Sequence, residues 1–223
     1  RKSRKQQKND RRRIVPITAK TPNQKDYIRD IVDNDVIFCT GPSGSGKSYI
    51  AAGIAANHIY RDEVDQIIVT RPLVCAGQDI GSLPGELDEK IKPYLLPMEE
   101  NLKHFLGRDY YGKLFNDGRI RYEPLEVMRG ATFHEAYMIL DEAQNCTLSQ
   151  IKMFITRMGE NSKVLINGDI RQTDIKKFSG LLECVDRLEG IEGVGVSRLY
   201  YEDIQRNGII GRVLEALEED YYD

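Results

Sequence analysis

The sequence predicts an α/β fold in which a three-layer, doubly wound parallel sheet forms a single domain. Short apolar runs of strand length alternate with longer segments of helical periodicity, which is the pattern of a parallel sheet covered by helices. One run leads into a glycine-rich turn, and another ends in two adjacent carboxylates. The 223 residues, 40% of them apolar, suffice for one compact domain with its own core.

The cysteines and the apolar runs indicate the compartment. The four cysteines lie far apart and include no C-x-x-C spacing, so neither a zinc site nor a disulfide framework is predicted. No apolar run approaches the roughly 20 residues that span a bilayer, and no signal-peptide pattern opens the sequence. We therefore expect a soluble protein of the reducing cytoplasm with no membrane partner.

Charge is distributed unevenly along the sequence. Residues 1–13 carry eight Lys or Arg and one Asp, whereas the other 210 residues carry 24 basic and 34 acidic side chains. A basic segment on an acidic body suggests contact with nucleic acid, and a solvated tail is the alternative interpretation. We expect residues 1–20 to form a flexible basic arm and residues 21–223 to form the single domain.

The first predicted helix begins after Thr21. Thr21 is a candidate cap, Pro22 suits the first helical position, and one apolar face is expected from Ile28, Ile31 and Val32.

Gln24 lies on this helix, just upstream of the glycine-rich turn. A glutamine amide can pair with both the N6 donor and the N7 acceptor of adenine. Gln24 is therefore a candidate adenine-reading residue, and an ordinary surface glutamine is the alternative.

The glycine-rich turn follows the apolar run 36–40 and has the phosphate-loop pattern G-x-x-x-x-G-K-S. Its backbone N–H groups and the start of the next helix form a cradle for a polyphosphate. Lys47 is expected to reach the β and γ phosphates and Ser48 to ligate Mg2+. ATP and Mg2+ are thus the predicted cofactors. The predicted nucleotide-binding residues of the loop are Gly41, Pro42, Ser43, Gly44, Ser45, Gly46, Lys47 and Ser48.

A helix over residues 48–60 and a buried strand over residues 66–70 are expected next, with His58 as a surface residue. Residues 75–120 form a less regular insertion to which the sequence assigns no chemistry. Its three prolines are expected to break helices and leave short amphipathic pieces, at Pro84, Pro93 and Pro97.

The apolar strand 136–140 delivers Asp141 and Glu142 at its carboxyl end, the edge at which open parallel sheets bind ligands. Asp141 suits a residue that holds Mg2+, and Glu142 suits the base that polarises an attacking water. Exposed acidic residues are common at strand ends, and the upstream phosphate loop favours the catalytic interpretation.

The remaining elements continue the alternation. A capped helix over 147–159, a strand over 164–166, a helix over 179–188, a strand over 194–199 and a closing helix over 204–217 are expected. The closing helix should turn Ile209 and Val213 inward. After the strand at 164–166, Asp169 and Gln172 are candidates to sense the γ-phosphate or its attacking water, and a simple turn is the alternative.

Four motifs together resemble the PhoH family, over about residues 21–217. They are residues 41–48, 83–87, 139–145 and 168–174. The resemblance implies a helicase-like core of the RecA type, related to superfamily 1 helicases, that hydrolyses ATP and is linked to RNA. It also matches Gln24 to an adenine-reading glutamine and Gln172 to a sensor. The nuclease domain of some members has no counterpart here, so nuclease function is not implied.

Two positions depart from the family pattern. Arg206 is followed by Asn207 and Gly208 where the family typically has His-Pro, and Ala131 stands where the family often has a second arginine.

A helicase-type site usually needs an arginine opposite the phosphate loop, and one core domain fits in this chain. We therefore expect a neighbouring subunit to supply it in a closed ring, for which the resemblance suggests six members. Arg206 is the favoured catalytic donor and Arg212 the reserve, with a surface arginine as the alternative.

Three functions are compatible with these features. The first is an ATP-driven motor acting on single-stranded RNA. The second is an ATP-dependent switch or scaffold for a protein partner without a nucleic-acid substrate. The third is a kinase for a small molecule, which Glu142 disfavours because a base beside the metal ligand suits water as the acceptor.

Overall fold

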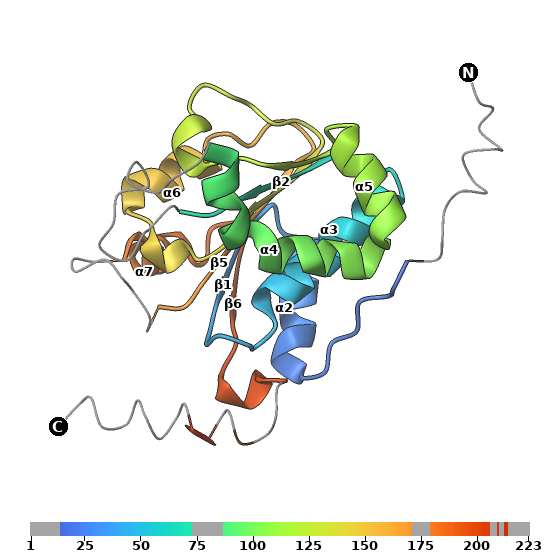
Figure 1. Ribbon diagram of the computed structural model, residues 1–223. Helices are drawn as coiled ribbons and strands as arrows, with labels where there is room; N and C mark the ends of the chain where they lie inside the picture. The colour runs from blue at the N-terminus through green and yellow to red at the C-terminus, as the bar shows by residue number, and fades with distance from the viewer. Residues whose placement is uncertain (1–13, 73–86, 171–178, 206–208, 210–211, 214–223) are drawn as a thin grey trace.

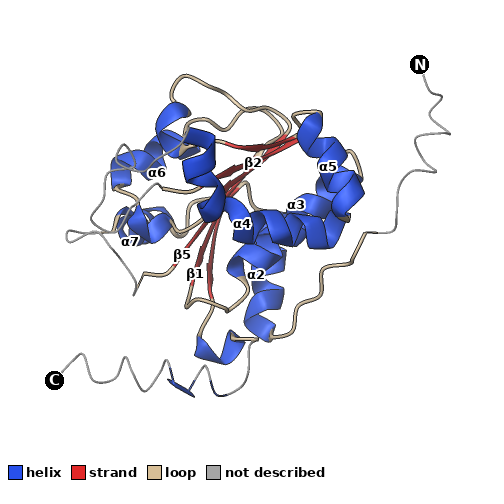
Figure 2. Cartoon of the chain, in the orientation of Figure 1, coloured by secondary structure: helices blue, strands red, loops and turns tan. Residues whose placement is uncertain are grey.

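The computed structural model describes residues 14–72, 87–170, 179–205, 209 and 212–213. Within this part of the chain, six parallel strands form one sheet in the order β3-β2-β4-β5-β1-β6. The strands are β1 (Val36–Thr40), β2 (Gln66–Thr70), β3 (Ile120–Tyr122), β4 (Ala136–Leu140), β5 (Lys163–Gly168) and β6 (Val194–Arg198). Figure 2 shows the strands between two groups of helices. The predicted α/β fold is confirmed.

The helices cover both faces of the sheet. The helices of the first face are α2 (Pro22–Asp33), α3 (Lys47–Tyr60), α4 (Leu87–Leu106) and α5 (Arg108–Asn116), and those of the second are α6 (Leu148–Ile155) and α7 (Gly180–Leu188) (Figure 1). Three short 3-10 helices complete the set: η2 (Leu125–Val127), η3 (Ala143–Asn145) and η4 (Tyr201–Asp203). Two separate apolar cores, one on each face, make the three layers. None of the described helices is both long and apolar enough to cross a membrane.

The strand order positions the site. β5 lies between β1 and β4, so the strand that precedes the phosphate loop and the strand that carries the carboxylates are one strand apart. Because all three strands run parallel, their carboxyl ends meet at one edge of the sheet. The loops after Thr40, Leu140 and Gly168 therefore face a common space.

Helix α2 confirms the predicted start and corrects the predicted face. Thr21 accepts a hydrogen bond from the backbone N–H of Gln24, and Pro22 is the first helical residue. The buried side chains are Gln24, Tyr27 and Ile31, whereas Val32 is 57% exposed. The prediction for Val32 was wrong because a burial face set by residues 24, 27 and 31 places position 32 on its solvent side.

The prediction that prolines fragment the segment 75–120 was also wrong where the structure describes it. Helix α4 continues through Pro93 and Pro97 and bends along its length (Figure 1). A proline removes one helical hydrogen bond and favours a kink. Burial of the later part of the helix against α3 offsets this cost, and the buried side chains there are Met98, Leu102, Phe105 and Leu106. Pro84 lies outside the described residues.

Two further predictions needed correction. The short strand β3, which pairs with β2 at the edge of the sheet, was missed because it lies within the segment judged irregular. In the predicted closing helix, Ile204 and Gln205 are not helical, and Ile209 and Val213 are 53% and 43% exposed instead of inward. Helix α6 ends at Ile155, four residues before its predicted end, while its predicted Thr147 and Gln150 capping box is present.

Candidate nucleotide site

The phosphate loop connects β1 to α3. Gly44 and Gly46 adopt positive φ angles of 85° and 103°, which glycine reaches without steric cost. A Cβ on Gly41 would come within 2.5 Å of the Leu199 carbonyl oxygen, so the loop passes closely over the end of β6. Among the described residues no side chain caps the start of α3. Its first N–H groups thus face the loop, as in anion-binding helix termini.

Lys47 folds back over this loop. Its Nζ donates to the carbonyl oxygens of Gly41 and Pro42, the latter at 2.9 Å. The ammonium therefore lies over the concave side of the loop, where an anion would replace these two carbonyl partners.

Ser48 and Asp141 are brought together from different elements. Oγ of Ser48, in the first turn of α3, donates to Oδ1 of Asp141, which follows β4, at 2.8 Å. Burial, and then the charge of Glu142, raise the pKa of Asp141, while the Ser48 hydrogen bond and the charges of Arg71 and Lys47 oppose this shift. A buried carboxylate beside a hydroxyl supplies the hard oxygen ligands that Mg2+ prefers, and a bound cation would stabilise the ionised form. The residues present fit a magnesium ion.

Glu142 lies in a strained backbone position and has two side-chain partners. Its φ of 57° is in the left-handed region, which is uncommon outside glycine and often marks a functional site. Arg71 Nη2 lies 3.2 Å from Glu142 Oε1, and Gln144 Nε2 donates to Glu142 Oε2. The carboxylate is thereby held at the rim of the same hollow as Lys47 and Ser48.

Gln144 links two loops of the site. Its Oε1 accepts from the backbone N–H of Asp169 at 3.0 Å, so the turn after β4 is tied to the end of β5. A Cβ on Gly168 would come within 2.9 Å of the Gln144 backbone nitrogen, which makes this close approach dependent on glycine. Asp169 is 5% exposed and lines the hollow, as predicted for a residue near the phosphates. Sequence analysis assigned no role to Gln144, although it belongs to the same run as Asp141 and Glu142.

Gln24 lies beneath the phosphate loop. It is 4% exposed, its Nε2 donates to the carbonyl oxygens of Ser45 at 2.9 Å and Asp203 at 3.4 Å, and its Oε1 accepts from the Lys20 backbone N–H. The alternative of a surface glutamine is therefore wrong. The amide joins the loop to η4, and adenine recognition by Gln24 stays a prediction.

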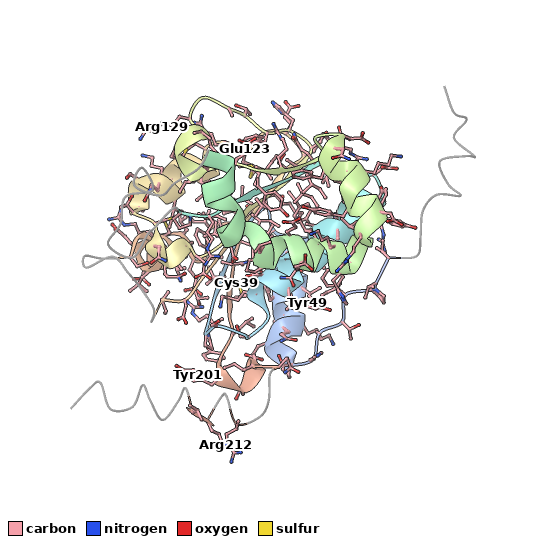
Figure 3. All side chains as sticks on the ribbon, in the orientation of Figure 1. Cys39, Tyr49, Glu123, Arg129, Tyr201 and Arg212 are labelled. Atoms are coloured by element: carbon pink, nitrogen blue, oxygen red, sulfur yellow. The ribbon has the colours of Figure 1, made fainter. Side chains whose placement is uncertain are left out.

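Asp203 was missed by the sequence analysis. It is fully buried and accepts hydrogen bonds from Thr21, from Asn23 Nδ2 at 3.0 Å and from the Tyr200 backbone N–H at 2.7 Å. No local pattern signals it, because the partners on α2 lie about 180 positions earlier in the chain. Gln172 and Arg206 lie outside the described residues. Arg212 is exposed and lies at the periphery of the molecule in Figure 3.

These side chains surround a hollow of about 380 Å³ at the carboxyl edge of the sheet. Its lining residues include Gly44, Gly46, Lys47, Ser48, Arg71, Asp141, Glu142 and Asp169. It combines a cationic loop with carboxylates, which is the composition that a metal-bound polyphosphate requires.

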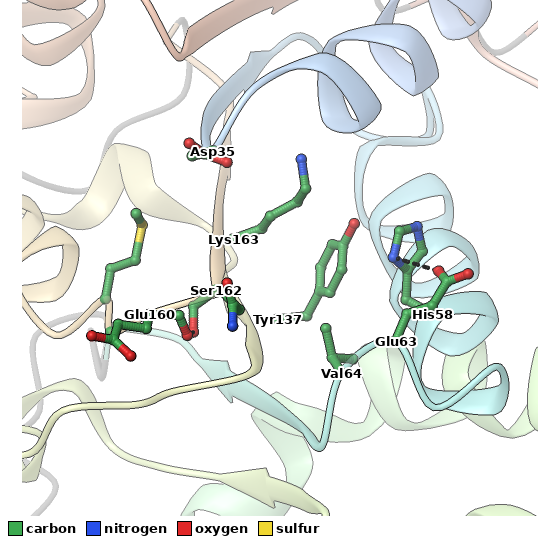
Figure 4. Close-up of a pocket in the computed structure, with 11 residues that line it drawn as sticks. Asp35, His58, Glu63, Val64, Tyr137, Glu160, Ser162 and Lys163 are labelled. Carbon is green, nitrogen blue, oxygen red and sulfur yellow. Dashed lines mark hydrogen bonds and ion pairs between the residues drawn. The ribbon is translucent and has the colours of Figure 1, made fainter.

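A second hollow, of about 430 Å³, lies at the opposite edge of the sheet (Figure 4). There Lys163 Nζ donates to carbonyl oxygens at the end of α2, and His58 pairs with Glu63 at 3.1 Å. His58 also packs edge-on against Tyr137, and burial lowers its pKa. The prediction of a surface histidine was thus wrong, because the end of α3 covers β4. This hollow is slightly larger, but it has no glycine loop, and the phosphate chemistry lies in the smaller one.

Comparison with protein families decides the affiliation. The sequence model described as PhoH-like protein matches residues 16–218. The chain belongs to the PhoH family.

Curated PhoH-family relatives cover most of the chain. The PhoH-like protein of Bacillus subtilis (strain 168) is 42% identical over 205 residues, which are 91% of this chain and 64% of the relative. Protein PhoH of Escherichia coli (strain K12) is 42% identical over 211 residues, which are 93% of this chain and 60% of the relative. The chain thus spans about three fifths of the length of these relatives.

Solved structures support the fold of this PhoH-family chain. The HK97 bacteriophage large terminase superposes with a TM-score of 0.53 at 17% identity and covers 84% of this chain and 42% of the terminase. The large terminase of a thermophilic bacteriophage in complex with ADP gives 0.50 at 13% identity and covers 91% of this chain and 50% of the terminase. At these identities the likeness concerns the fold, which is that of a P-loop NTPase.

Proposed function

We propose that this PhoH-family chain binds ATP with Mg2+ and hydrolyses it. The observation that supports this most directly is the convergence of Lys47, Ser48, Asp141 and Glu142 on one hollow. These residues come from the phosphate loop and from the end of a strand more than 90 positions later. Each has the side-chain chemistry that its proposed role requires.

Lys47 would exchange its carbonyl partners for phosphate oxygens of the β and γ groups. Ser48 and Asp141 would hold Mg2+, which neutralises charge on those oxygens when bound. Glu142 would accept the proton of an attacking water. Asp169 from the loop after β5, together with Gln172, would sense the γ-phosphate, and Gln24 would contact adenine.

Water is the proposed acceptor of the phosphoryl group. Glu142 immediately follows the proposed metal ligand and lines the hollow beside Lys47. A kinase would need this position to lie near a substrate hydroxyl, and no feature of the described residues indicates a hydroxyl-substrate site beside it. Hydrolysis is therefore favoured over phosphoryl transfer to a small molecule.

The further proposal is a ring-shaped motor that couples ATP turnover to single-stranded RNA. It is supported by family membership and by the eight basic residues among positions 1–13. The alternative is an ATP-dependent switch or scaffold for a protein partner, which the acidic composition of residues 14–223 favours. In a ring of identical chains, Arg206 would be supplied across the interface.

ATP turnover measured with and without single-stranded RNA tests both levels. Turnover that rises with RNA supports the motor. Turnover without RNA or DNA binding at low salt favours the switch, because a phosphate-contacting protein binds most tightly at low ionic strength. Absence of turnover and of ATP binding in the wild-type protein would refute the ATPase.

A further inference from the structure

Arg71 stands beside the proposed catalytic carboxylate because of the strand order. It follows β2, which pairs with β4, and the Asp141 backbone N–H donates to the Thr70 carbonyl oxygen at 3.0 Å. The guanidinium therefore extends along the edge where Asp141 and Glu142 emerge. Arg71 lines the same hollow as Lys47 and Ser48.

The contact between Arg71 and Glu142 has the properties of an exchangeable ion pair. Nη2 and Oε1 are 3.2 Å apart, and the side chains are 25% and 37% exposed. Ion pairs that retain contact with water contribute little, typically about 0 to 1 kcal/mol. A more highly charged anion that enters the hollow would therefore compete effectively for the guanidinium.

The γ-phosphate of ATP is such an anion. It carries more charge than one carboxylate, and its oxygens suit the planar fork of an arginine, which binds phosphate through two parallel hydrogen bonds. ADP lacks this group, so it offers Arg71 no equivalent partner.

We propose that Arg71 exchanges partners when ATP binds, leaving Glu142 and contacting the γ-phosphate. This inference rests on the ATPase function proposed above. The exchange would release Oε1 of Glu142 for a water molecule, while Gln144 still holds Oε2. Arg71 would thus be an arginine supplied within the same subunit, and it would keep the base restrained while the site is empty or holds ADP.

Equilibrium binding distinguishes this exchange from a purely structural ion pair. The probes are Mg-ADP and Mg-adenylyl-imidodiphosphate, a triphosphate analogue that resists hydrolysis. Arg71→Ala should reduce the preference for the triphosphate analogue over ADP by about tenfold or more, the scale of one charge-assisted hydrogen bond, and leave ADP affinity within about twofold. Arg71→Lys should recover part of the preference, since it keeps the charge without the fork.

The matched control is Arg187→Ala. Arg187 pairs with Glu183 on the exposed side of α7, far in sequence from the hollow, so its loss should leave both affinities unchanged. Thermal melting of each variant without nucleotide verifies folding, and Arg71→Lys serves if Arg71→Ala does not fold.

A second background separates direct from indirect action. In Glu142→Gln protein the carboxylate charge is absent, so Arg71→Ala can change the triphosphate preference only through a contact with the γ-phosphate itself. A persistent loss of preference supports the exchange. A loss that disappears in this background, or equal weakening of both nucleotides, overturns it. Wild-type protein that binds neither nucleotide would instead refute the proposed ATPase, and the inference with it.

Discussion

The hydroxyl of Ser48 donates a hydrogen bond to Oδ1 of Asp141 across 2.8 Å. This contact joins the first turn of α3 to the end of β4, although β5 separates β4 from the strand that carries the phosphate loop. It brings together two oxygen ligands suited to one metal ion. The variants below test the roles assigned around it.

Lys47→Ala should nearly abolish nucleotide binding or turnover, because it removes the point charge that faces the β and γ phosphates. We expect turnover to fall by at least about a hundredfold, the scale for loss of one group that stabilises transition-state charge. Steady-state turnover and the nucleotide-dependent shift in melting temperature measure this. Lys152→Ala, an exposed change on α6, is the control. Wild-type turnover in Lys47→Ala protein would refute the site.

Glu142→Gln should keep ATP and Mg2+ binding and lose at least about a hundredfold in turnover, the usual contribution of a general base. The amide retains the shape of the side chain but cannot accept the proton. Binding and single-turnover measurements separate the two effects. If the variant lost binding and kept its rate per bound ATP, Glu142 would be a ligand and the base would be another residue.

Two glycines in helices should respond oppositely to alanine. At Gly112, in α5, an added Cβ meets no atom within 4 Å, so Gly112→Ala should stabilise the fold by about 0.4 to 1 kcal/mol. At Gly180, in α7, the Cβ would lie 2.2 Å from the Leu148 backbone nitrogen, so Gly180→Ala should destabilise it by about 1 to 3 kcal/mol. Denaturant midpoints measure both, and equal shifts would contradict the described packing of α7 against α6.

Deletion of residues 1–13 should weaken RNA affinity and flatten its dependence on salt. Eight cations would leave the set that can contact phosphates, and each contact adds to the slope of log affinity against log salt. Fluorescence anisotropy with a single-stranded RNA at several salt concentrations measures the slope. An unchanged slope would mean that the segment is a solvated tail.

Mixing of two inactive variants tests a donor arginine in a neighbouring subunit. Arg206→Ala should lower turnover by about 10³ to 10⁵, the contribution of an arginine finger. Arg206→Ala and Lys47→Ala subunits each lack one half of every site, whereas a mixed ring contains some complete sites. Recovery of activity on mixing supports the ring. Full activity of Arg206→Ala as a monomer would refute both the finger and the ring, and would favour Arg71 as the arginine of the site.

The local elements of the fold were predictable from sequence because their causes are local. The phosphate loop depends on glycines and the residues that follow them, and the Thr147 capping box closes within three residues. The buried strands could be predicted from continuous apolar runs, since both of their faces are covered. Asp141 and Glu142 could be assigned because a parallel sheet presents its carboxyl ends at one edge.

Other features depended on the tertiary structure because their partners are remote in sequence. The pairing of Arg71 with Glu142 follows from the adjacency of β2 and β4, which no local pattern specifies. The burial of Asp203 against α2 requires the end of β6 to return beside the first helix. Helix α4 continues through Pro97 because packing against α3 outweighs a local preference. Sequence thus determined the chemistry available at the sheet edge, and tertiary packing decided which side chains restrain it.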